Sequence, residues 1–144
     1  MEDVSVIWED FQRFQDACQE LKSKSILVGI VGTSDSEVLK IAAIHEYGLG
    51  KMPERSFIRA SFDANQDKLA EITASALTKV LKNQTSAAAA AESIGAQAAQ
   101  LTQNYIDENR VKPQSDFSKK RQHTTLFETG THIRDRIAYK VVSD

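Results

Sequence analysis

The sequence predicts an α+β fold, in which a small, mostly antiparallel sheet packs with an N-terminal helix, a short helix and a long helical hairpin. Two long stretches in the middle of the chain carry apolar residues at three- and four-residue spacing, and a polar break separates them. Two short runs rich in β-branched residues lie on either side of this helical region. A length of 144 residues predicts a single domain over residues 1–144.

The first third of the chain predicts a helix, a strand and a short helix in that order. Apolar residues recur on one side of Ile7–Lys22, which favours an amphipathic helix. The compact run Ile26–Val31 is typical of a buried strand. Ser34 and Glu37 have capping-box spacing and predict the start of a short helix. Gly48 is expected to end that helix, because glycine adopts a left-handed conformation at little cost.

Two longer helices are expected next. Pro53 lies where a new element begins, a position at which its missing N–H costs no hydrogen bond. A long helix is then predicted from about Glu54 to Lys82, and an alanine-rich helix from about Ala87 to Asn109. The short polar break between them favours an antiparallel hairpin, and one bent continuous helix is the alternative.

The last third of the chain predicts a loop and a strand. Residues 111–125 are polar, basic and poor in apolar side chains, which is typical of an exposed, mobile loop. Arg136–Val142 alternates in a way that predicts a strand, and Ile26–Val31 is its expected partner.

Composition narrows the classes of function. The net charge of −2 disfavours non-specific binding to duplex DNA, which usually needs a basic patch. The single cysteine, Cys18, excludes an internal disulfide and a cysteine-based zinc cluster, and we expect it to be a small buried side chain. No apolar run approaches the roughly 20 residues that span a bilayer.

The sequence motifs do not predict an enzyme or a cofactor. His45-Glu46 begins like a His-Glu-x-x-His zinc helix, but Leu49 stands where the second histidine is needed. A structural or capping role for His45 is the better interpretation. Gly48-x-Gly50-Lys51 lacks the spacing of a phosphate-binding loop, so a simple turn explains it.

Arginine and aromatic residues are enriched in protein interfaces, and they suggest candidate contact residues here. Phe57 has two equally good interpretations, as an interface residue or as part of the core. The basic residues after position 110 would meet phosphate, an acidic partner or only solvent. Arg134 and Arg136 would form ion pairs between subunits or lie on a solvated surface. The candidate interface residues are Arg55, Phe57, Arg59, Lys119, Lys120, Arg121, Arg134 and Arg136.

Two further blocks of the chain are Ile41–Arg59, IAAIHEYGLGKMPERSFIR, and Leu126–Val142, LFETGTHIRDRIAYKVV. They resemble the first and second signature blocks of the tail-completion, or virion-morphogenesis, proteins of tailed bacteriophages. That family usually has Pro-Ala-Arg-Pro-Phe where this chain has Pro-Glu-Arg-Ser-Phe, and Pro-Leu-(Ile/Val)-Asp-Thr-Gly where it has Thr-Leu-Phe-Glu-Thr-Gly. The order and spacing of the blocks are kept. The signature turn positions are Gly48, Pro53, Thr129 and Gly130.

The resemblance implies a structural subunit of a bacteriophage or prophage neck or upper tail, which completes the tail tube and joins it to the head. Its implied partners are further copies of itself in a ring, a hexamer that matches the tube, together with the tail tube and the head–tail connector. DNA would pass through without sequence-specific binding, and no membrane is involved. The protein would be made in the host bacterial cytoplasm and located in the virion. The alternatives are a tail terminator or connector adaptor, and, from other classes, a small hydrolase or a DNA-binding module.

Overall fold

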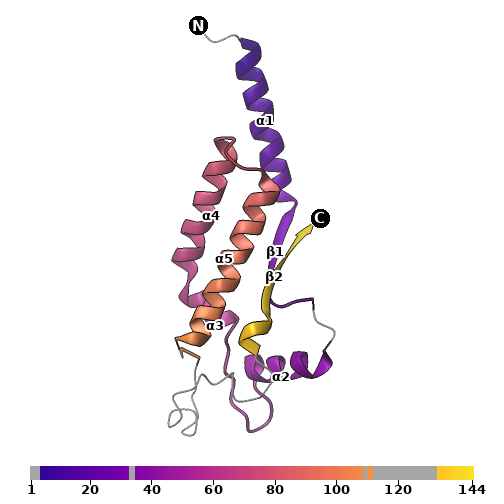
Figure 1. The fold of residues 1–144 in the computed structure, drawn as a ribbon, viewed down its shortest axis with the longest axis vertical. Coiled ribbons are helices and arrows are strands. Elements are labelled where there is room, and N and C mark those ends of the chain that lie inside the picture. Colours follow the sequence, from indigo (N-terminus) through magenta and orange to yellow (C-terminus); the bar gives the residue numbers. More distant parts are fainter. Residues whose placement is uncertain (1–3, 33–34, 109, 112–132) are drawn as a thin grey trace.

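The computed structural model describes residues 4–32, 35–108, 110–111 and 133–144. The predicted α+β class is confirmed, because helices pack with a two-stranded antiparallel sheet (Figure 1). The elements are α1 (Val4–Lys22), β1 (Lys24–Ile30), α2 (Ser36–Tyr47), α3 (Arg59–Ala64), α4 (Gln66–Leu81), α5 (Ala87–Asp107), the 3-10 turn η1 (Ile133–Arg136) and β2 (Ile137–Ser143).

The sheet joins two distant parts of the chain. β1 pairs with β2 antiparallel, from Lys24 opposite Ser143 to Ile30 opposite Ile137, so the predicted strand pairing is confirmed. Two strands alone are only marginally stable in water. Helix α5 packs along them and supplies the apolar surface that the sheet needs (Figure 1).

Helices α4 and α5 form the predicted antiparallel hairpin (Figure 1). Its second helix starts at a cap, because the Ser86 side chain accepts a hydrogen bond from the Ala89 N–H at 3.1 Å. Gly95 lets α5 approach the sheet closely. A Cβ atom at this position would lie 2.9 Å from Cγ of Tyr139, so a larger residue would displace that ring.

Two apolar clusters hold these elements together. The larger one lies where α2, α5, η1 and β2 meet, and the smaller one joins the hairpin to the end of α1. The larger cluster contains Ala42, Phe57, Ala99, Ile106, Val111, Ile133 and Ile137. The smaller cluster contains Ala76, Val80, Ala87 and Ala90, with Ala17, Leu21 and Ile94 packed against it.

The predicted long helix over Glu54–Lys82 is wrong in its first part. Residues 53–58 are not helical, so Pro53 does not open a helix, and α3 begins only at Arg59. A second break follows at Asn65, whose side-chain amide donates to the Ser61 carbonyl at 2.8 Å. The apolar periodicity continues through both breaks, and α3 and α4 both pack against α5.

Three smaller predictions also need correction. Asp35 caps α2, because its carboxylate accepts from the N–H groups of Glu37 and Val38 at 3.1 and 3.3 Å; the predicted cap, Ser34, lies outside the described residues. Val111, the first residue of the predicted loop, is fully buried, and residues 112–125 lie outside the described part of the chain. Cys18 is only partly buried.

Candidate interaction site

The first signature block folds around the carboxylate of Glu46. This side chain, near the end of α2, is only 5% exposed. Its Oε1 accepts from the Ser56 hydroxyl at 2.8 Å, the Arg59 N–H at 3.0 Å and Arg59 Nε at 2.9 Å. Its Oε2 accepts from the N–H groups of Phe57 and Ile58, both at 3.0 Å. The carboxylate therefore takes up the unpaired N–H groups at the start of α3.

The surroundings of Glu46 keep it ionised. Burial by itself would raise the pKa of Glu46, because a charge is poorly solvated there. Hydrogen bonds from the N–H groups of Ile58, Arg59 and Phe57, and from the Ser56 hydroxyl, outweigh burial and lower that pKa below its ordinary value. Both oxygens are occupied by donors of the chain itself, so Glu46 holds structure together.

Arg59 completes this cluster. Its Nη2 donates to the Glu46 carbonyl at 2.6 Å and to Glu54 Oε1 at 3.0 Å. Its guanidinium carbon lies 4.8 Å from the centre of the Tyr47 ring. The hydrogen bond that Arg59 donates to Glu46, followed by the negative charges nearby, raises the pKa of Arg59. This predicted interface residue thus makes its main contacts inside its own chain, although its guanidinium is half exposed.

Phe57 and His45 also lie inside the fold. Phe57 is fully buried in the larger cluster, so of its two interpretations the structure favours the core. His45 is buried as well, and burial, followed by the positive charge of Arg55, lowers the pKa of His45. The backbone N–H of Arg55 donates to the His45 carbonyl at 2.7 Å, which fixes the loop before α3.

The turn between α2 and this loop requires glycine. Gly48 has φ of 77°, and its N–H donates to the Ile44 carbonyl, so its predicted helix-ending role is confirmed. A Cβ atom there would lie 2.9 Å from both the Met52 carbonyl oxygen and the Glu54 nitrogen. Pro53 lies in the exposed stretch that leads from this turn to Ser56.

The remaining candidate residues do not gather at one place. Arg134 forms a forked pair with Asp107, with Nε–Oδ1 at 3.0 Å and Nη2–Oδ2 at 2.9 Å, and also contacts Asp135 at 3.1 Å. Arg136 is exposed. The other basic candidates and two signature positions lie outside the described residues: Lys119, Lys120, Arg121, Thr129 and Gly130.

Helix α1 carries an apolar surface whose exposure was not predicted from the sequence. Its upper turns extend past the turn of the α4–α5 hairpin, while Ala17 and Leu21, near its end, pack against the smaller cluster (Figure 1). Trp8 is 64% exposed, and its ring lies 6.0 Å from that of Phe11. We name this surface the aromatic face of α1. It consists of Val4, Ile7, Trp8, Phe11 and Phe14, and all five side chains are exposed.

A second apolar surface lies at the end of α2. Tyr47, Leu49 and Met52 are all more than half exposed there. A shallow hollow of about 360 Å³ opens beside them, and we name it the α2 hollow. Its lining residues are Lys40, Ala43, Ile44, Tyr47, Gly48 and Leu49.

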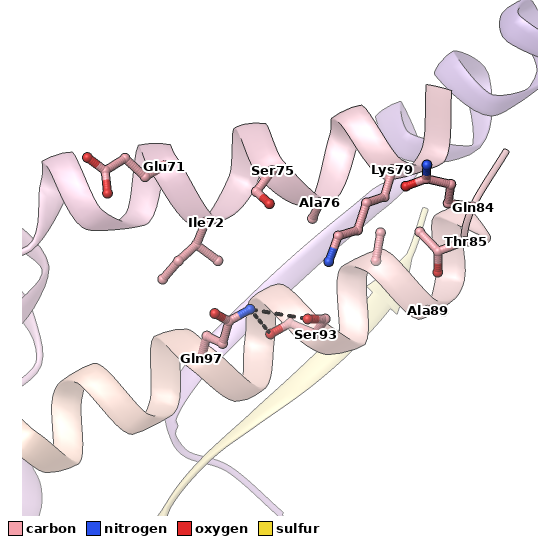
Figure 2. Close-up of a pocket in the computed structure, with 11 residues that line it drawn as sticks. Glu71, Ile72, Ser75, Ala76, Lys79, Gln84, Thr85, Ala89, Ser93 and Gln97 are labelled. Atoms are coloured by element: carbon pink, nitrogen blue, oxygen red, sulfur yellow. Dashed lines mark hydrogen bonds between the residues drawn. The ribbon is translucent and has the colours of Figure 1, made fainter. Parts of the chain in front are cut away.

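The larger hollow, of about 540 Å³, is a groove between α4 and α5 (Figure 2). Small side chains such as Ala76 and Ala89 line it, and Lys79 points into it from α4. Gln97 donates to the Ser93 carbonyl and hydroxyl at 3.3 and 3.2 Å.

Searches for other kinds of site and for relatives gave no match. Within the part of the chain that the structure describes, no three His, Cys, Asp or Glu side chains gather as metal ligands would. Among the described helices, none combines the length and the apolar character needed to cross a bilayer. No family model, curated protein or solved structure matches this chain.

Proposed function

We propose that this protein is a structural subunit of a bacteriophage or prophage neck or upper tail, which completes the tail tube and joins it to the head as a ring, most simply a hexamer. The observation that carries the proposal is the aromatic face of α1. Monomeric proteins rarely leave a contiguous group of large apolar side chains in water, and such a surface is typical of a protein–protein interface. The kind of assembly is suggested by the two signature blocks, whose order along the chain resembles that of tail-completion proteins.

The Glu46 cluster suits a subunit that must hold a rigid contact surface. It ties the end of α2 to the start of α3 through both carboxylate oxygens. The exposed Tyr47 and Leu49 side chains are thereby carried on a fixed turn. Under the proposal, the first signature block therefore holds the interface residues in position for assembly.

The negative net charge of the chain supports the proposal that DNA passes through the ring without binding to it. The chain has a net charge of −2, and phosphate backbones are attracted chiefly by clustered lysine and arginine. A tail terminator or a connector adaptor would use the same surfaces, and the position of the ring on the particle distinguishes these two from a joining protein.

The proposal is tested with purified protein and with tails assembled in its absence. Native mass spectrometry and negative-stain imaging should show a closed ring, alone or on the end of the tail tube. Adding the protein should restore the joining of those tails to heads. A protein that stays monomeric, ignores tubes and does not restore joining would contradict the proposed function.

A further inference from the structure

We propose that copies of this chain associate head to tail, with the aromatic face of α1 on one copy covering the α2 hollow of the next. The inference names the interface of the ring and rests on the function proposed above. A contact between two different surfaces of the same chain is heterologous, and repetition of such a contact closes a ring when the rotation between neighbours permits it.

The first argument is that, among the described residues, each copy exposes two apolar surfaces. The first turns of α1 project beyond the hairpin, and α2, which lines the hollow, lies toward the opposite end of the molecule (Figure 1). One chain cannot bring them together, since α1 is fixed at its end by Ala17 and Leu21. A second copy can cover both surfaces with one kind of contact.

The second argument is charge complementarity. Helix α1 contains four acidic and two basic residues, which gives it a net charge of −2. Lys40 lines the α2 hollow, and Lys51 lies in the adjoining turn. Glu54, an acidic residue nearby, is held by Arg59 at 3.0 Å. The net negative charge of α1 and the positive charges of Lys40 and Lys51 favour the encounter of the two elements.

The same charges disfavour two other partners for α1. Pairing of one α1 with another would bring acidic helices together, and juxtaposed like charges weaken an interface. Helices that lie on membrane surfaces are typically rich in lysine and arginine, whereas α1 is acidic. The α2 hollow is therefore the better match for the aromatic face.

The area is sufficient for a specific contact. A fully buried aromatic side chain removes about 150–250 Å² from water, so three that are about half exposed contribute roughly 300 Å². Val4 and Ile7 add to this on α1, and Tyr47, Leu49 and Met52 contribute a comparable area on the hollow. Both sides together reach roughly 1,000 Å², the size at which specific interfaces begin.

The test uses one charged substitution on each surface. Phe11→Asp changes the aromatic face and Leu49→Asp changes the hollow; these side chains are 49% and 61% exposed, so the fold should be kept. Leu81→Asp, at an apolar position 44% exposed and outside both surfaces, is the matched control. Circular dichroism checks that all three variants fold, and native mass spectrometry and light scattering measure their assembly.

We expect the unchanged protein and the Leu81→Asp variant to form the same ring. Phe11→Asp and Leu49→Asp should each associate at least tenfold more weakly, because interface energy concentrates in a few apolar anchors. An equimolar mixture of these two variants should form a one-to-one pair. Each variant retains one intact surface, so the mixture restores a single head-to-tail contact and no more.

Other outcomes would overturn the interface. Ring formation by Leu49→Asp together with failure of Phe11→Asp would indicate that α1 meets another α1 or a different surface. A mixture without pairs, or unchanged protein that is monomeric but binds phosphatidylcholine vesicles through Trp8, would also overturn it. A ring that depends on both surfaces but ignores tails contradicts only the proposed function. Rings on tails that tolerate both substitutions contradict only the interface.

Discussion

Replacing Glu46 with glutamine tests whether its carboxylate holds the first signature block together. The substitution keeps the size of the side chain but removes its charge and one of its two acceptor oxygens. In the native protein those oxygens accept five hydrogen bonds, three of them from consecutive backbone N–H groups. We therefore expect Glu46→Gln to destabilise the protein at neutral pH.

The expected magnitude follows from the donors left without an acceptor. If the amide nitrogen takes the place of Oε2, the N–H groups of Phe57 and Ile58 lose their partner. A buried unsatisfied donor costs about 1–3 kcal/mol, and Phe57 is fully buried while Ile58 is partly so. A total of about 3 kcal/mol lowers the melting temperature by roughly 9 °C for a protein of this size.

The destabilisation should depend on pH in one direction. The pKa of Glu46 is lowered in the folded state from an ordinary value of 4.5. The stabilisation from its charge is therefore fully present above about pH 4.5 and is lost as the pH falls through the lowered folded pKa. The difference between the unchanged protein and Glu46→Gln should narrow on acidification.

The assay is urea unfolding followed by circular dichroism, at neutral pH and at several acidic values. Glu54→Gln is the matched control, because Glu54 is exposed and contacts the same arginine at 3.0 Å. Its stability should stay close to that of the unchanged protein, as exposed ion pairs contribute little. If Glu46→Gln were as stable as the control at every pH, the role assigned to the Glu46 carboxylate would be refuted.

Three further predictions concern residues of the fold. Burial and the charge of Arg55 lower the pKa of His45 from 6.5, so the stability of the protein should fall as the pH drops below about 6.5. The stability of His45→Ala, measured by urea unfolding, should lack this pH dependence. This variant should still assemble. Gly95→Ala should lose about 1–3 kcal/mol through contact with the Tyr139 ring, and a Tyr139→Leu background should reduce that loss in thermal unfolding. Phe57→Ala should lose about 3–5 kcal/mol in urea unfolding, whereas an equally stable variant would contradict its place in the core.

The sequence alone determined the elements whose signals are local. Periodic apolar residues located α1 and the two helices of the hairpin, because a helix repeats its face every three to four residues. The turn at Gly48 followed from backbone freedom that glycine supplies. The β-branched runs predicted both strands and their pairing.

Other features depend on residues that are distant in the chain, and only the tertiary structure decided them. The start of α3 is set by Glu46, thirteen residues before Arg59, and a pattern read along the chain does not contain this acceptor. The burial of Phe57 was also decided only by the tertiary structure, since its place in the sequence fits a core position and an interface position equally well.

The aromatic face of α1 shows most clearly which features follow from the sequence and which depend on the tertiary structure. The sequence identified an amphipathic helix over Ile7–Lys22, and the structure places its end against the hairpin and leaves its aromatic face exposed. Periodicity states that one face of a helix is apolar, but it does not state what covers that face. The length of α1 beyond the hairpin decides this, because within the described part of the chain the apolar side chains of its first turns remain exposed.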